Sequence, residues 1–307
     1  MNTKLPLPFI AWHPIFKHPL PEGHRFPMLK YELLPEQLLY EGVVSESDFF
    51  TPEILDEKLL EGVHQPAYYR RLFSLELTKT EIRRIGFPLS PQLIERELRI
   101  AQGTVDAAVA AMKCGIGFNI AGGTHHAGSD WGEGFCLLND QAIAAHYLWK
   151  EGFAKHILIL DLDVHQGNGT ADIFKNHPDI FTFSMHGQNN FPFKKEQSDV
   201  DVGLLDGISG VEYLSILKAQ LDVLAQLVQP DFVFYQAGAD VLATDKMGKL
   251  KLTKEDVRQR DKAVFDCCKK LGVPVQVSMG GGYSERISDI VDTHCQTFKE
   301  GIAAMLH

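Results

Sequence analysis

The chain has 307 residues, of which 45% are hydrophobic and 23% charged, and its formal net charge is -10. This composition indicates a globular protein with enough apolar material for a sizeable core. The acidic balance argues against nucleic acid or an anionic membrane as the main partner, because both require a basic surface, and it favours cationic substrates instead.

The cysteines and the N-terminal stretch indicate the compartment. The five cysteines form no CxxC pair and no regular framework, so we expect a reducing, cytoplasmic location. Prolines interrupt the apolar start "MNTKLPLPFIAWHPIF". No apolar run approaches the roughly 20 residues that span a membrane. We therefore expect neither a signal peptide nor a membrane span.

The first part of the chain contains few regular patterns. Up to about residue 50 it is rich in proline, which predicts surface loops and short turns. Thr51 as N-cap and Pro52 as first helical residue then predict a helix over residues 51–62. Ser90 and Pro91 repeat this signal at the start of a longer helix.

Short apolar runs alternate with helical patterns in the rest of the chain. Strands are predicted near residues 116–120, 156–162, 180–185, 231–237 and 273–279, and helices near 139–150, 210–228, 253–271 and 284–305. This alternation predicts an α/β protein, formed as one domain over residues 1–307, with a mainly parallel sheet between helices. Ligands of such sheets bind outside the carboxyl ends of the strands.

Metal-binding residue types lie at two of these strand ends. In "HILILDLDVHQGNGT", Asp161, Asp163 and His165 occupy alternate positions, which point to the same side of a strand. Asp240 ends the run "DFVFYQAGAD". Two carboxylates and one imidazole suit a Zn²⁺ site with one position open, although Mn²⁺ and Fe²⁺ accept the same donors. An isolated Asp-x-His is also compatible with a simple turn.

Candidate proton-transfer residues lie at the other two strand ends. His125 and His126 follow a strand in "GGTHHAG", and a pKa near 6.5 suits an acid or a base, although both are also ordinary loop residues. Asp161 and Asn168 are candidates to orient the two imidazoles. Tyr283 follows three glycines, where it either donates to a developing oxyanion or only ends a turn.

Four segments together resemble the signature segments of the zinc-dependent histone deacetylase superfamily. They are "GGTHHAGSDWGEGFCLLND", "DLDVHQGNGT", "YQAGAD" and "MGGGYS", and they span roughly residues 115–284. The forms "HQGNG" and "GGTHH" look most similar to the class IV branch and to bacterial deacetylase-like amidohydrolases. The resemblance implies the arginase-deacetylase fold, a parallel sheet of about eight strands between helices.

The resemblance also implies the cofactors. It assigns one catalytic Zn²⁺ to Asp163, His165 and Asp240. It further implies a structural K⁺, held mostly by backbone oxygens of Asp161, Asp163, His165, Ser184 and Met185.

Catalytic and substrate-binding roles follow from the same resemblance. His126 matches the histidine that transfers protons beside the metal, and His125 matches its partner, supported by Asp161. Tyr283 matches the residue that stabilises the transition state. Two aromatic residues match the walls that grip the acyl-lysine stem, Phe135 and Phe191.

Two positions depart from the class I pattern. Asn168 replaces an aspartate, so the protonated form of His126 is expected to be less stabilised. Gly122 and Gly123 replace two prolines, which predicts a deeper cavity and a preference for long acyl chains. If neighbours such as Met185 close that gap, an acetyl-sized pocket is expected instead.

The sequence therefore predicts a zinc-dependent amidohydrolase that acts on N-acyl-lysine in peptides or proteins. An acetylpolyamine or another small acylated amine is the main alternative substrate. An arginase-like ureohydrolase would need ligands for two Mn²⁺ ions, and the pattern provides ligands for one metal. A non-catalytic acyl-lysine binder is the third alternative, and the oligomeric state stays open.

Overall fold

A computed structural model describes residues 9–306 of the protein. Eight strands form one sheet in the order β2-β1-β3-β8-β7-β4-β5-β6, and every pairing is parallel. The strands are β1 Ile10–Ala11, β2 Phe49–Phe50, β3 Ile116–Asn119, β4 Ile157–Asp161, β5 Ile180–Gly187, β6 Val200–Leu204, β7 Phe232–Gln236 and β8 Val275–Ser278. The predicted α/β class and parallel sheet are confirmed, whereas a single domain over residues 1–307 stays a prediction.

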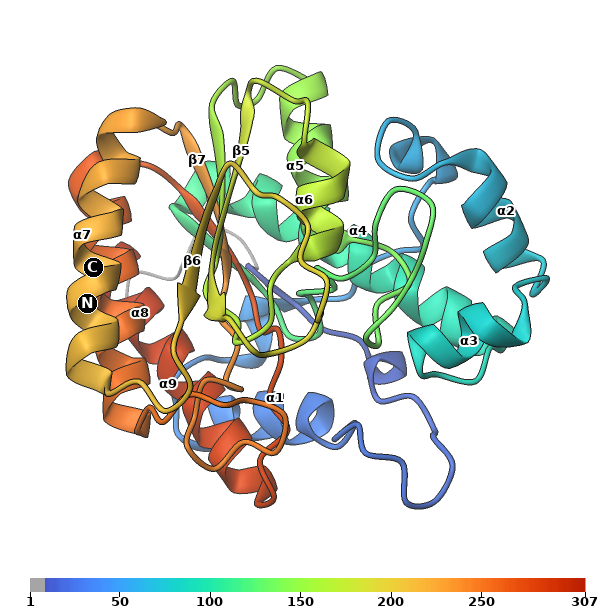
Figure 1. The fold of residues 1–307 in the computed structure, drawn as a ribbon, viewed down its shortest axis with the longest axis horizontal. Coiled ribbons are helices and arrows are strands. Elements are labelled where there is room, and N and C mark those ends of the chain that lie inside the picture. The colour runs from blue at the N-terminus through green and yellow to red at the C-terminus, as the bar shows by residue number, and fades with distance from the viewer. Residues whose placement is uncertain (1–8, 307) are drawn as a thin grey trace.

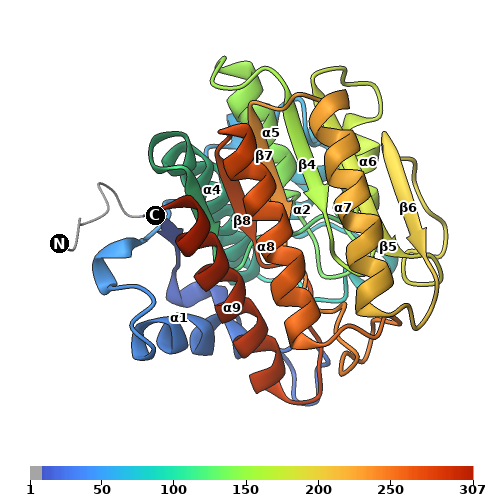
Figure 2. The same ribbon diagram turned by 90° about the vertical axis from the view of Figure 1, so that its left-hand side faces the viewer.

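Helices cover both faces of this sheet. They are α1 Lys30–Tyr40, α2 Pro66–Phe73, α3 Lys79–Ile85, α4 Pro91–Cys114, α5 Asp140–Lys150, α6 Asn168–Phe174, α7 Gly210–Leu227, α8 Lys254–Leu271 and α9 Ile287–Met305. Helices α4, α5 and α6 lie on one face, and α7, α8 and α9 lie on the other (Figures 1 and 2). Within residues 9–306, we find no helix of the length and apolarity that a membrane crossing requires.

The central strands are apolar because they are buried on both sides. Every residue of β3, β4, β7 and β8 is buried. Because all strands are parallel, their carboxyl ends lie along one edge of the sheet, and the loops after β3, β4, β7 and β8 meet there.

The predicted start of the long helix is confirmed. The Ser90 side chain accepts a hydrogen bond from the Leu93 amide, and Pro91 is the first residue of α4. The helix ends before Gly115, whose φ of 93° lies in the left-handed region that favours glycine.

Two expectations for the first 65 residues are wrong. Residues 51–56 are not helical, and only a short 3₁₀ helix forms there, Glu57–Leu60. The Pro52 carbonyl, which would accept a hydrogen bond in the first turn of the predicted helix, instead accepts from the Arg99 guanidinium of α4 at 2.8 Å. The segment before residue 50 is not only loop, since it contains β1, β2 and α1. Pro35 inside α1 cannot donate to the Tyr31 carbonyl, and the indole N–H of Trp12 donates to that carbonyl instead, at 3.0 Å.

Candidate active site

The three predicted metal ligands converge between the loops after β4 and β7. Nδ1 of His165 lies 3.1 Å from Oδ1 of Asp163 and 3.1 Å from Oδ2 of Asp240. The donor atoms of the three side chains all lie within 4.8 Å of one another, and all three side chains are buried. This arrangement offers two oxygens and one nitrogen to a single point.

The surroundings fit a divalent metal at this point. A Cβ on Gly238 would overlap the Asp163 carboxylate, and one on Gly281 would overlap the Asp240 carboxylate, so glycine is required at both positions. Burial and the charge of Asp163 raise the pKa of Asp240 to about 7. Two carboxylates buried this closely repel each other, and a bound cation offsets that repulsion. The donor set suits zinc with one coordination position open.

His125 lies beside this cluster and is held by Asp161, as expected. Its Nδ1 is 2.6 Å from Oδ2 of Asp161, and its Nε2 is 3.9 Å from Oδ1 of Asp163. Burial opposes protonation, but the charge and hydrogen bond of Asp161 outweigh it and raise the pKa of His125 to about 9. Asp161 therefore favours the protonated form of the buried His125 imidazole.

His126 is held by Asn168, and a further residue lies behind Asn168. Nδ1 of His126 is 2.7 Å from Oδ1 of Asn168. The Asn168 amide nitrogen donates to Oε1 of Glu133 at 2.5 Å, and Oε2 of Glu133 accepts from Nε of Arg84 at 2.6 Å. Asn168 lacks a charge of its own, but the Glu133 carboxylate supplies one at the next position in the chain of hydrogen bonds.

This chain of hydrogen bonds determines the tautomer of His126. A carboxylate only accepts hydrogen bonds, so Glu133 requires the NH₂ group of Asn168 to face it. The Asn168 oxygen then faces His126 and must accept from Nδ1–H, which leaves Nε2 unprotonated. Burial and the neighbouring charge of His125 lower the pKa of His126 well below its ordinary value. The neutral imidazole therefore presents a base to the cavity.

Sequence reasoning missed Glu133. It lies in the quoted segment "GEGFC", but its spacing from Asn168 gives no sign that the two residues touch. Only the fold brings these residues, 35 positions apart, into contact.

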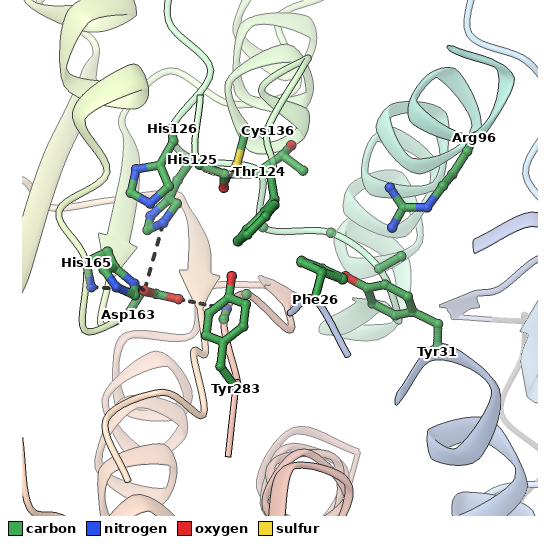
Figure 3. Close-up of a pocket in the computed structure, with 17 residues that line it drawn as sticks. Phe26, Tyr31, Arg96, Thr124, His125, His126, Cys136, Asp163, His165 and Tyr283 are labelled. Atoms are coloured by element: carbon green, nitrogen blue, oxygen red, sulfur yellow. Dashed lines mark hydrogen bonds and ion pairs between the residues drawn. The ribbon is translucent and has the colours of Figure 1, made fainter. Parts of the chain in front are cut away.

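Tyr283 lies across the cavity from the histidine pair (Figure 3). Its ring meets the His165 ring edge-on at a centroid distance of 6.4 Å, and its backbone N–H donates to Asp245 at 2.6 Å. Burial and the charges of Asp240 and Asp163 hold the pKa of Tyr283 well above its ordinary value. The hydroxyl therefore stays protonated and acts as a donor.

Phe135 and Phe191 line the cavity that leads from the surface to these residues. Phe135 has a φ of 70°, a left-handed conformation that costs a non-glycine residue about 1 kcal/mol or more. The Phe191 ring meets the His126 ring edge-on at a centroid distance of 5.0 Å. Both expected aromatic walls thus stand at the entrance to the site.

Gly122 and Gly123 line the inner cavity but do not deepen it. A Cβ on Gly122 would lie 2.6 Å from Oδ2 of Asp140, and a Cβ on Gly123 would lie 2.6 Å from the Gly280 nitrogen. The inner cavity has a volume of about 30 Å³, and its lining residues Tyr31 and Arg96 lie on the side opposite the histidine pair (Figure 3). Neighbouring polar groups therefore occupy the space beside both glycines, and the acyl chain length that the cavity accepts stays a prediction.

Three of the residues expected to hold potassium lie in neighbouring strands, and the other two, Asp163 and His165, follow in the loop after β4. The register of β4 and β5 pairs Asp161 with Ser184, and Met185 follows in β5. The Ser184 hydroxyl lies 2.9 Å from Nδ1 of His186. Potassium binding itself stays a prediction.

The fold and the site together define a class of protein. A parallel α/β sheet carries, at its carboxyl edge, a buried metal-type triad facing two histidines and a tyrosine. Such a combination is typical of metal-dependent hydrolases.

Comparisons with known proteins identify the family. The histone deacetylase domain matches residues 24–298, so the chain belongs to the histone deacetylase family of hydrolases. It is 44% identical over 285 residues to an uncharacterized protein of Picosynechococcus, covering 93% of this chain and 95% of that protein. It is 27% identical to histone deacetylase 2 of Arabidopsis thaliana, covering 87% and 72% of the two chains. The crystal structure of an HDAC homolog from Aquifex aeolicus has the same fold, with a TM-score of 0.81, 23% identity, and coverage of 94% and 82%.

Proposed function

We propose that the protein hydrolyses the amide of N-acetyl-lysine in peptides or proteins, using Zn²⁺ held by Asp163, His165 and Asp240. The observation that carries the proposal is the meeting of this triad with His126 and Tyr283 in one cavity. When bound, zinc supplies Lewis-acid chemistry toward the amide carbonyl and the attacking water.

The residues of the chain then have distinct roles. Nε2 of His126 takes a proton from the attacking water and returns it to the departing amine nitrogen as the C–N bond breaks. Tyr283 donates its hydroxyl to the carbonyl oxygen as that atom gains negative charge. Glu133 acts through Asn168 as a positioning residue, because it keeps His126 in the tautomer that accepts the proton.

The size of the inner cavity favours a short acyl group. Its 30 Å³ leave room for two or three water-sized groups, at roughly 10–15 Å³ each. This space suits an acetyl group better than a chain of eight carbons.

An arginase-like reaction has less support. Within residues 9–306, one group of metal-type side chains is found, whereas a two-manganese site needs a second. Hydrolysis of an acetylpolyamine would use the same catalytic residues. An acetylpolyamine differs from an acetyl-lysine peptide in the additional positive charges that it carries.

The test is a panel of acetyl-lysine and decanoyl-lysine peptides and acetylspermidine, assayed with zinc-loaded protein. We expect the highest kcat/KM for acetyl-lysine. Tyr283→Phe, which lacks only the hydroxyl, should retain zinc and lower kcat on the order of 10²-fold. Loss of zinc in that variant, or an unchanged kcat, would contradict the role of Tyr283, and a decanoyl preference would contradict the short acyl group.

A further inference from the structure

The entrance to the site is positively charged, although the whole chain carries a net charge of -10. This entrance is a cavity of about 410 Å³. Its fully charged lining residues are all cationic, namely Arg25, Arg84 and Lys249. No carboxylate lines it among residues 9–306. The net charge of the chain thus misrepresents the surface that a substrate meets.

Two of these cations are poorly compensated. Arg84 is paired with Glu133 at 2.6 Å, so its charge is largely balanced. Lys249 has a carboxylate only at 4.0 Å, Asp206, and both side chains are about half exposed. Arg25 has no carboxylate within 4.0 Å in the described part of the chain, and its guanidinium lies 5.1 Å from the centre of the Phe135 ring.

The same cavity leads directly to the catalytic candidates. His126, His165 and Tyr283 line its inner end, and Phe135 and Phe191 stand between them and the surface. A substrate whose lysine stem passes between the two phenylalanines therefore places its neighbouring groups beside Arg25 and Lys249. Phe193, a residue that is 87% exposed, adds an apolar contact at the same rim.

We propose that the entrance selects acyl-lysine with acidic residues beside it in the peptide. This inference rests on the proposed amide hydrolysis at the same site. Carboxylates of the peptide would pair with Arg25 and Lys249, which lack a close carboxylate partner, although the Lys249 ammonium donates to the Asn189 carbonyl at 2.9 Å. Acetylpolyamines and lysine-rich segments bring positive charge to the same rim, and like charges placed together disfavour the wrong partner.

The experiment compares two peptides that share one central acetyl-lysine and differ only in flanking aspartates or flanking lysines. We expect kcat/KM to favour the acidic peptide on the order of tenfold, mostly through KM, because exposed charge pairs are individually weak. Raising the ionic strength from about 0.05 M to about 1 M should remove most of this preference by screening.

Variants test the named residues. Arg25→Glu and Lys249→Glu should each reduce the preference for the acidic peptide, and the double variant should reverse it. Lys218→Glu changes the net charge equally, but Lys218 is exposed on α7 and does not line the entrance, so the preference should stay unchanged. If the charge-reversal variants do not fold, Arg25→Gln and Lys249→Gln, which remove the charge without reversing it, are used in their place.

The possible outcomes separate the two proposals. Equal kcat/KM for both peptides in the wild type, or a preference for the basic peptide, would overturn the selection of acidic substrates. If Lys218→Glu reduces the preference for the acidic peptide as much as Arg25→Glu does, the assignment of this preference to the cations of the entrance is overturned. Hydrolysis of neither peptide, nor of a neutral acetyl-lysine control, would instead contradict the proposed function.

Discussion

At the scale of single residues, Asn168 shows how a neutral side chain can replace a charged one. Its oxygen faces His126 and its NH₂ group faces Glu133, so the negative charge lies one residue farther away than in a direct carboxylate pair. The orientation of the amide depends on Glu133, because Nδ1 of His126 accepts or donates according to which end of Asn168 it meets.

This dependence predicts an unusual pattern in paired variants. In Glu133→Gln, the Gln oxygen is engaged by Arg84 and its NH₂ group faces Asn168, so the Asn168 amide flips and His126 adopts the wrong tautomer. In Asn168→Asp, two carboxylates meet. We expect each single variant to lower kcat on the order of tenfold or more. The double variant exchanges the charge and the amide and satisfies every hydrogen bond, so it should recover most of the activity.

Steady-state kinetics of the four proteins in a double-mutant cycle measure this coupling. Losses that simply add in the double variant would show that Glu133 does not act through Asn168. Zinc content should stay unchanged in all four proteins, because none of these residues belongs to the metal triad.

At the scale of elements, His64 connects three segments at the back of the site. Its Nδ1 lies 2.9 Å from the Gly128 carbonyl, and its Nε2 accepts from the Asn139 amide at 2.9 Å. Nδ1 must therefore carry the proton, and Asn139 in turn caps α5. The neutral ring thus ties the chain before α2 to the loop that follows the histidine pair.

The titration of His64 predicts a pH dependence of stability. Burial lowers the pKa of His64 from 6.5 to about 4. The folded state therefore disfavours protonation of His64. The stability that the neutral ring contributes is fully present above pH 6.5 and is lost as the pH falls toward 4. Between pH 8 and pH 5, the wild type should lose about 2 kcal/mol of unfolding free energy through this group.

His64→Gln provides the matched control, because its amide also donates and accepts but does not titrate. Urea unfolding at pH 8 and pH 5 should show a smaller loss in this variant by about the same 2 kcal/mol. An identical pH dependence in both proteins would show that His64 is not the group responsible.

At the scale of the whole molecule, the metal site joins loops from two strands that are adjacent in the sheet. Asp163 and His165 follow β4 and Asp240 follows β7, while Gly281, after β8, donates to Asp163 at 2.8 Å. A cation bound there stabilises the folded chain, because the unfolded chain does not hold the ligands together.

Zinc should therefore raise the Tm, and a chelator should lower it. At a free zinc concentration about 100 times the Kd, the gain is about 2.7 kcal/mol, or about 4 °C for a chain of this size. Asp240→Asn replaces a carboxylate ligand by a weaker, neutral amide oxygen and removes the repulsion with Asp163, so this variant should fold but show a much smaller zinc-dependent shift. Differential scanning calorimetry with and without chelator checks this, and an equal shift in both proteins would place the metal elsewhere.

Local patterns in the sequence predict the central strands, the capped helices and the positions of the triad. A strand buried on both faces must be an apolar run, and the polar residues after it must lie at the carboxyl edge of the sheet. Ser90, Pro91 and Gly115 act through their immediate neighbours, so the bounds of α4 are visible without the fold.

Only the tertiary structure decides the features that depend on residues far apart in sequence. Arg99 of α4 takes the Pro52 carbonyl that the helix predicted over residues 51–62 would use, and the Trp12 indole satisfies the carbonyl that Pro35 leaves open in α1. The fold places Glu133 behind Asn168 and fills the space beside Gly122. It also gathers cations at the entrance of an acidic protein, because a net charge records how many charges a chain has, whereas folding determines where they lie.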